Sequence, residues 1–226
     1  MKYKRVLAFG DIHGHFSKFM TLYERVGVTD EDFAIFLGDY VDRGPENVAS
    51  LQWIMEQSKK PNVVALRGNH EQMMLDGIMH NDLNWYFNGG LKTLMDIRAE
   101  VKKNPSFITD AIAFIRNCPL YRRMTVDGRE YIFCHAGVDA YVDHDPPIEE
   151  QDKLKILWTR EDFYNYYEGA AMYVVGHTPL QYLGVEPPYP IKVEGRNIWM
   201  IDTGSYFDDG KISCIDVRTE RIWQSD

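Results

Sequence analysis

Short apolar runs recur along the chain, and each is bounded by Gly, Asp, Asn or His. Runs of this length between turn-forming residues are typical of strands that are buried on both faces. They occupy residues 6–9, 33–37, 63–66, 131–134, 172–175, 198–201 and 212–217. We therefore predict strands at these positions, and we expect the last third of the chain to be mostly strand.

Helical periodicity separates the first three of these runs. Apolar side chains recur at helical spacing from Phe16 to Val26, and again from Val48 to Met55. The second stretch follows Pro45, and proline is favoured in the first turn of a helix. The first half therefore has the order β-α-β-α-β, which predicts an α/β fold with sheets covered by helices.

Residues 84–117 form a different kind of segment. Their apolar positions recur at helical spacing and are interrupted by Asn104 and Pro105. We predict a helical insertion that lies outside the sheet. The sequence shows no linker, repeat or low-complexity tract, and its 226 residues suit one domain spanning 1–226.

The net charge of the chain disfavours some classes of binding partner. The 25 Lys and Arg residues against 34 Asp and Glu give a formal net charge of −9. This balance argues against broad contact with nucleic acid or with an anionic membrane. A small anionic substrate remains compatible, because a few well-placed cations dominate a local field.

The spacing of the cysteines and the length of the apolar runs indicate in which cellular compartment to expect the protein. Cys118, Cys134 and Cys214 stand far apart in no paired spacing, which is typical of reduced, buried thiols. The apolar run after the basic N-terminus is too short for a signal peptide, and no run approaches the roughly 20 residues of a membrane span. We expect a cytoplasmic protein that is not inserted in a membrane.

Polar side chains follow six of the predicted strands, each beside a glycine. They are Asp11, His13, Asp39, Asp42, Asn69, His70, His135, His177 and Asp202. Any one of them alone is most simply a turn former or a helix cap. In open α/β sheets, however, ligands bind at the carboxyl ends of strands, so their joint occurrence favours one shared site. Oxygen and imidazole groups without thiolate suit Mn²⁺, Fe or Zn²⁺ in a two-metal centre better than a structural zinc site.

The motifs around these residues resemble those of a known family. Gly-Asp-Ile-His-Gly at 10–14, Gly-Asp-Tyr-Val-Asp-Arg-Gly at 38–44 and Gly-Asn-His-Glu at 68–71 resemble the phosphoprotein phosphatases, which belong to the calcineurin-like metallophosphoesterases. His-Ala-Gly at 135–137 and Gly-His-Thr-Pro at 176–179 resemble the bacterial and bacteriophage serine/threonine phosphatase branch. The resemblance implies two mixed β-sheets packed as a sandwich and flanked by helices, with metals at one edge.

The resemblance also implies two divalent cations per subunit, most simply Mn²⁺, with Fe or Zn²⁺ as alternatives. The implied ligands are Asp11 and His13 for one cation, Asn69, His135 and His177 for the other, and Asp39 as the bridge between them. In such centres the cations lie about 3.5–4 Å apart, and a hydroxide between them attacks phosphorus directly.

Further roles follow from the same resemblance. His70 corresponds to a general acid that protonates the leaving oxygen, and Asp42 orients it. Arg43 and Arg67 flank the metal motifs and are expected to bind phosphoryl oxygens. Arg160 resembles a third phosphate-binding arginine.

Several features have no assigned role at this stage. Asp202 fits a supporting or structural position better than that of a ligand, and residues 84–117 either shape specificity or only cover the sheet. A group of aromatic residues after Arg160 forms either core or a wall of the substrate groove: Phe163, Tyr164, Tyr166 and Tyr167.

The leading functional hypothesis is a metal-dependent phosphomonoester hydrolase acting on phosphoserine or phosphothreonine in proteins. The segments 41–45 and 158–161 favour it modestly over a dinucleoside polyphosphate hydrolase such as a diadenosine tetraphosphatase. An inactive binding scaffold is a remote alternative, because every implied ligand position is filled. The negative charge and the pairing of His70 with Asp42 disfavour a nucleic-acid phosphodiesterase.

Overall fold

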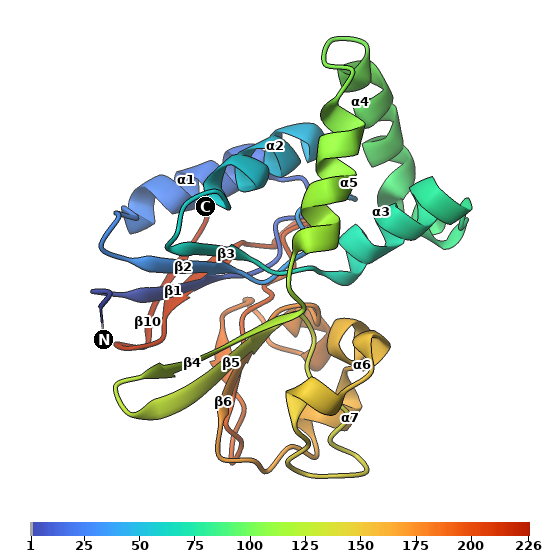
Figure 1. Cartoon of the computed structure of the whole chain (residues 1–226). Coiled ribbons are helices and arrows are strands. Elements are labelled where there is room, and N and C mark those ends of the chain that lie inside the picture. Colours follow the sequence, from blue (N-terminus) through green and yellow to red (C-terminus); the bar gives the residue numbers. More distant parts are fainter. Residues whose placement is uncertain (1) are drawn as a thin grey trace.

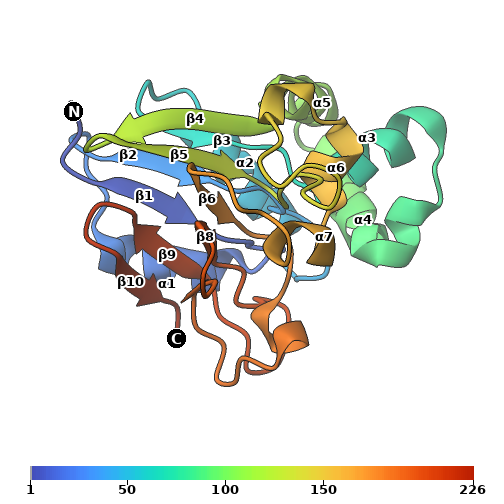
Figure 2. The ribbon, with the colours of Figure 1, turned by 90° about the horizontal axis from the view of Figure 1, so that it is seen from below.

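Two mixed β-sheets of five strands each face one another in the computed structural model, which describes residues 2–226 (Figures 1 and 2). The first sheet has the order β10-β9-β1-β2-β3, with β1 (Val6–Phe9), β2 (Phe33–Phe36), β3 (Val63–Ala65), β9 (Ser213–Asp216) and β10 (Arg221–Gln224). The second has the order β4-β5-β6-β8-β7, with β4 (Tyr121–Val126), β5 (Arg129–Cys134), β6 (Met172–Val175), β7 (Ile191–Lys192) and β8 (Ile198–Met200).

The central strands of each sheet run parallel. β1, β2 and β3 are mutually parallel in the first sheet, as are β5, β6 and β8 in the second. Parallel neighbours bring their carboxyl ends to the same edge of a sheet. The loops that carry the predicted site residues therefore leave both sheets at a common edge.

Both faces of the central strands are buried, which explains their continuous apolar sequences. In β1, Val6 and Ala8 point into the core between the sheets, whereas Leu7 and Phe9 pack under the helices of the outer face. The side chains of β5 and β6 divide in the same way between the sandwich core and a third cluster. Strands buried on both faces lose the alternating pattern of half-buried strands.

Helices cover the outer faces (Figure 1). Over the first sheet lie α1 (Phe16–Val26) and α2 (Asn47–Gln57), followed to one side by α3 (Asn69–His80), the π-helical turn η1 (Tyr86–Gly90), α4 (Leu91–Val101) and α5 (Phe107–Asn117). Beside the second sheet lie α6 (Lys153–Trp158) and α7 (Glu161–Tyr164), with the 3₁₀ turns η2 (Ile148–Glu150) and η3 (Leu180–Leu183). No helix within residues 2–226 is both long and apolar enough to cross a membrane.

All seven predicted strands are present, with bounds that differ by one or two residues at some ends. The predicted helices after β1 and β2 are confirmed, and residues 84–117 are helical with a break between α4 and α5 at Asn104 and Pro105. Strands β4, β7 and β10 and helices α3, α6 and α7 were not predicted. The edge strand β4 carries Arg122 and Arg123 at exposed positions, so its sequence lacks an apolar run.

The structure also decides two smaller questions. Residues Cys118, Cys134 and Cys214 are buried free thiols, as expected. Among the aromatic residues after Arg160, Phe163 is 1% exposed and Tyr167 is 0% exposed, and both pack in the core on the outer face of the second sheet. Their packing role is confirmed, whereas Tyr166 lies at the surface against Tyr141.

Candidate metal centre

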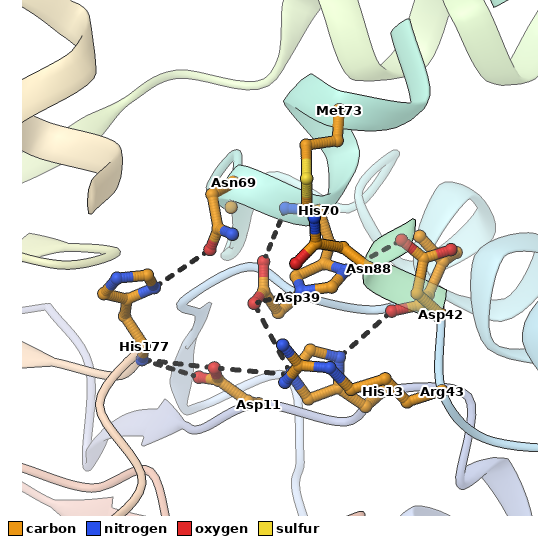
Figure 3. Close-up of polar contacts among 12 residues, drawn as sticks. Asp11, His13, Asp39, Asp42, Arg43, Asn69, His70, Met73, Asn88 and His177 are labelled. Carbon is orange, nitrogen blue, oxygen red and sulfur yellow. Dashed lines mark hydrogen bonds and ion pairs between the residues drawn. The ribbon is translucent and has the colours of Figure 1, made fainter. Parts of the chain in front are cut away.

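The strand-end residues converge on one buried cluster (Figure 3). Its members come from the segments that follow β1, β2, β3, β5 and β6, including the first turn of α3: Asp11, His13, Asp39, Asp42, Asn69, His70, His135 and His177. Every one of these side chains is buried. Burial of so many polar groups is costly unless each has a partner or a bound cation.

The backbone of the cluster adopts an uncommon conformation. His13, Asp39, Asp42, Arg43 and His177 have φ values of 46°, 53°, 73°, 70° and 64°. Non-glycine residues in this left-handed region cost roughly 1–2 kcal/mol each, and such residues concentrate at functional sites. The strained backbone of these loops lowers the stability of the fold, and it directs these side chains toward the cluster.

Two glycines let the loops after β2 and β3 approach each other. A Cβ atom on Gly38 would lie 2.5 Å from the backbone nitrogen of Gly68. A Cβ atom on Gly68 would lie 2.2 Å from Oδ1 of Asp39. The glycine before Asp39 and the one before Asn69 thus make room for the contact between the two loops.

Asp39 lies between two groups of side chains that could hold metal ions (Figure 3). Its Oδ2 is 3.5 Å from Nε2 of His13, and its Oδ1 is 3.3 Å from Nε2 of His135. His13, Asp39 and His70 form one group, and Asp39, His135 and His177 form the other. The bridging role that the family resemblance implies for Asp39 stays a prediction.

The second group contains acceptors that face each other. His135 donates its Nδ1 hydrogen to the carbonyl of Leu37 at 2.9 Å, which leaves its Nε2 lone pair 2.7 Å from Oδ1 of Asn69. The same Asn69 oxygen is 2.9 Å from Nδ1 of His177. Burial alone would lower the pKa of His135, but Asp39 and the Leu37 carbonyl raise it. In this arrangement a cation bound between His135 and Asn69 would satisfy both acceptors.

The donor set fits divalent cations. Nε2 of His177 is buried and has no hydrogen-bond partner within the described chain. Burial lowers the pKa values of His13 and His177 well below their usual range, which favours the neutral imidazole that binds metals. Burial, with the nearby carboxylates of Asp202 and Asp39, raises the pKa of Asp11 well above its usual range. Cations would relieve this crowding of buried carboxylates, and oxygen and nitrogen ligands suit Mn²⁺, Fe or Zn²⁺.

Asp11 and His70 are placed differently from what the implied ligand set suggests. The Asp11 carboxylate accepts the backbone N–H of His177 and lies 4.0 Å from Nε2 of His13. It stands beside the group of His13, Asp39 and His70 rather than within it. The ring of His70 has Nδ1 2.7 Å from Oδ2 of Asp42 and Nε2 3.9 Å from Oδ2 of Asp39. The Nδ1 atom of His70 is therefore engaged by Asp42, and its Nε2 atom faces Asp39.

Two of the three predicted arginines border the cluster. Nη1 of Arg43 lies 3.0 Å from Nε2 of His13, and its guanidinium stacks 4.1 Å from the ring centre of Tyr206. Arg160 donates to the carbonyl of His177 at 3.1 Å and lines a surface cavity of about 500 Å³. Both guanidiniums keep further N–H groups with which to bind an anionic substrate.

Arg67, the third of the predicted arginines, contacts the end of α5. Its guanidinium donates to the side chain of Gln72 and to the carbonyls of Ile115, Arg116 and Cys118. These carbonyls lie at the end of α5, where a helix leaves acceptors unpaired and favours positive charge. Arg67 therefore caps a helix in this structure, and phosphate binding by Arg67 stays a prediction.

Glu71 is a buried residue whose role sequence reasoning missed. Its carboxylate accepts the backbone N–H groups of Asp39 and Tyr40, both at 2.8 Å, and that of Gly68 at 2.9 Å. Burial, with the nearby charge of Asp39, raises the pKa of Glu71 to about 7. Its position three residues after Gly68, at a helix start, was the available signal. Glu71 ties the loop of the bridging Asp39 to the start of α3.

We expect Glu71→Gln to loosen this junction. The amide would place an N–H₂ group against a backbone N–H of Asp39, Tyr40 or Gly68, so at least one donor would lose its acceptor. The free energy of unfolding should fall by about 1–3 kcal/mol, as measured by denaturant unfolding, and Mn²⁺ should bind more weakly in a titration. Glu46→Gln is the control, because Glu46 accepts a backbone N–H at an exposed position and should change stability by less than about 0.5 kcal/mol. Unchanged stability and Mn²⁺ affinity in Glu71→Gln would contradict this role.

Comparison with known proteins places the chain among enzymes with related folds. A family model described as calcineurin-like phosphoesterase matches residues 4–202. Serine/threonine-protein phosphatase 2 of Salmonella typhimurium is 28% identical over 225 residues, which cover 96% of this chain and 94% of that protein. The asymmetrical bis(5'-nucleosyl)-tetraphosphatase PrpE of Anoxybacillus flavithermus is 27% identical over 222 residues, which cover 88% of this chain and 84% of that protein.

Solved structures share the fold at lower identity. A crystal structure of a candidate diadenosine tetraphosphatase has a TM-score of 0.68 at 15% identity, covering 97% of this chain and 92% of that one. A protein serine/threonine phosphatase from Saccharomyces cerevisiae has a TM-score of 0.63 at 14% identity, covering 100% of this chain and 81% of that one. These likenesses confirm the predicted pair of mixed sheets flanked by helices. Because the family model spans most of its length, the chain belongs to the calcineurin-like phosphoesterase family.

Proposed function

We propose that this protein is a metal-dependent phosphomonoesterase that hydrolyses phosphoserine and phosphothreonine in proteins. The observation that carries the proposal is the buried hydrogen bond of 2.7 Å between Nδ1 of His70 and Asp42, directly beside the candidate metal ligands. Hydrolysis of an alkyl phosphate requires a proton for a poor leaving group. A histidine held by a buried carboxylate beside the cluster is suited to deliver that proton.

The proposed ligands are the buried oxygen and nitrogen donors of the cluster: Asp11, His13, Asp39, Asn69, His135 and His177. Two divalent cations bound there, Mn²⁺ in the simplest case, would stabilise the charge on the phosphoryl group and lower the pKa of a water molecule.

The other roles belong to side chains of the chain itself. Arg43 and Arg160, on two sides of the cluster, would bind the nonbridging phosphoryl oxygens. Nε2 of His70 would donate its proton to the oxygen that leaves phosphorus, and the Asp42 carboxylate would stabilise the imidazolium before transfer. The products are the free hydroxyl side chain and inorganic phosphate.

A second substrate class is supported by a specific observation. Trp158 lies with its ring centre 6.0 Å from that of His177, and the residue is 37% exposed. Aromatic rings of this kind stack on nucleobases, which a dinucleoside tetraphosphate would provide. The relative from Anoxybacillus flavithermus carries that activity in its name.

One comparison separates these candidates. The same Mn²⁺-loaded preparation is assayed for kcat/KM on a phosphoserine peptide, a phosphothreonine peptide and diadenosine tetraphosphate. We expect the phosphopeptides to be the better substrates. A higher kcat/KM on the dinucleotide would favour the second class, and no turnover of any ester by metal-loaded protein would favour an inactive scaffold.

Metal removal tests the cofactor proposal. Exhaustive chelation should abolish turnover, and added Mn²⁺ should restore it, because the proposed ligands are all oxygen or nitrogen atoms. Circular dichroism should show that the fold survives, since the core between the sheets consists of apolar side chains outside the ligand cluster. Full turnover in a sample shown by elemental analysis to hold no metal would contradict the proposal.

A further inference from the structure

The helical segment 84–117 makes a polar contact with the centre that the motifs did not predict. Nε1 of Trp85 lies 3.1 Å from Oδ1 and 3.0 Å from Oδ2 of Asp42. The hydroxyl of Thr93 donates to Oδ1 of Asp42 at 2.5 Å. All three side chains are 0% exposed. Two donors from this segment thus meet on the carboxylate that pairs with His70.

The indole of Trp85 is fixed in a narrow slot. Gly77 of α3 lies against the six-membered ring of the indole, and Gly90 at the end of η1 lies against the edge that carries Nε1. A Cβ atom on Gly77 would lie 2.5 Å from the indole ring, and one on Gly90 would lie 2.3 Å from it. Any larger residue at either position would push the ring out of place. The direction of its N–H group is therefore determined by the packing of α3 and η1.

Together these contacts immobilise Asp42. Its carboxylate has about four acceptor positions, and His70, Trp85 and Thr93 occupy three of them. The donors come from different elements, so the carboxylate cannot rotate without breaking at least one bond. A buried carboxylate that lost such partners would pay a desolvation penalty and would be free to turn away from His70.

We propose that Trp85 and Thr93 are positioning residues, which hold Asp42 so that His70 presents its proton to the leaving oxygen. This inference rests on the acid role given to His70 under the proposed function. It assigns the segment 84–117 a part in catalysis beyond covering the sheet. The segment acts through Asp42 and needs no contact with the substrate.

The competing explanation is simple packing, because both residues also fill buried space. Three variants separate the two explanations. Thr93→Val keeps the shape but removes the hydroxyl donor, whereas Thr93→Ser keeps the donor. Thr203→Val is the matched control, since Thr203 is a buried threonine that donates at 2.7 Å to a carbonyl of Lys211, away from Asp42.

The first measurement is the leaving-group dependence of turnover by the Mn²⁺-loaded enzymes. We expect Thr93→Val to lower kcat about 10-fold on phosphoserine, and less than about twofold on 4-nitrophenyl phosphate, whose leaving group needs no proton. Thr93→Ser should restore the native profile. Trp85→Phe, which removes only the N–H donor and part of the ring, should change the profile in the same direction. A loss caused by packing would be equal on every ester.

The second measurement is independent of activity and of metal. The Nδ1 proton of His70 should give a downfield resonance in the NMR spectrum of metal-free protein, assigned by its loss in His70→Asn. The resonance should persist in Thr93→Ser and Thr203→Val. It should shift or broaden in Thr93→Val, because Asp42 then becomes mobile.

The outcomes distinguish this inference from the proposed function. In one outcome, His70→Asn steepens the leaving-group dependence of kcat, whereas Thr93→Val and Trp85→Phe change neither this dependence nor the His70 resonance. The positioning role is then wrong and the acid role stands. If His70→Asn itself shows no leaving-group dependence, the acid role is wrong, and the positioning role falls with it.

Discussion

Asp39→Asn should lower kcat/KM by about 10³-fold or more and reduce the binding of both cations. Asp39 is the one side chain shared by both candidate metal groups, with its two oxygens facing His13 and His135. An amide offers one neutral acceptor where the carboxylate offers two charged ones. Metal-based stabilisation of charge in the transition state amounts to several kcal/mol, and each 1.36 kcal/mol is a factor of ten in rate. Elemental analysis and Mn²⁺ titration of the variant measure the occupancy directly.

Asp216→Asn is the matched control for that substitution. Asp216 is a buried carboxylate on β9 of the same sheet, where it accepts backbone N–H groups far along the strand from the cluster. Its amide variant tests the effect of removing a buried charge without touching the proposed ligands, so it should retain two cations. Two tightly bound metals per chain in Asp39→Asn would show that Asp39 is not the bridge.

The strands and the cluster were predictable for the same physical reason. Strands buried on both faces are apolar throughout, so the polar residues that directly follow them are easy to recognise in the sequence. Ligands bind at the carboxyl ends of such strands, which is why these polar residues indicated a site. Three of the four edge strands, β4, β7 and β10, were not predicted, because each carries side chains that are exposed to solvent. Strand β4 with its exposed arginines and the short β7 and β10 therefore lack a continuous apolar run.

The contacts that sequence reasoning missed at Arg67, Thr93 and Trp85 join segments that lie far apart in the chain. Arg67 binds carbonyls that are 48 to 51 residues away along the chain, at the end of α5. Thr93 reaches Asp42 over 51 residues, and Trp85 reaches it over 43. No local pattern contains such pairings, because they arise only when residues 84–117 fold back on the first sheet. The contacts of Arg67 with the end of α5 therefore have no signal in the motif that contains it.

His70→Asn should separate chemistry from metal binding. Proton transfer by a positioned acid contributes about 10²–10⁴-fold, so we expect a loss of that size in kcat on phosphoserine. An aryl ester whose phenol is strongly acidic leaves as its anion and should lose much less. Asp42→Asn should show the same dependence more mildly, because it perturbs the acid without removing it. The measurement is kcat for each variant across phosphate esters of graded leaving-group pKa.

The metal content of His70→Asn decides the remaining question of geometry. The ring of His70 lies in one candidate metal group with His13 and Asp39, yet its Nδ1 is committed to Asp42 at 2.7 Å. If His70 is the acid, the variant should hold as much Mn²⁺ as the native protein and lose rate only where the leaving group needs a proton. His144→Asn, a change at an exposed histidine whose ring contacts a carbonyl of Tyr166, should alter neither quantity. An equal loss on every ester together with a missing cation would instead make His70 a ligand, and Asp42 would then orient a ligand rather than an acid.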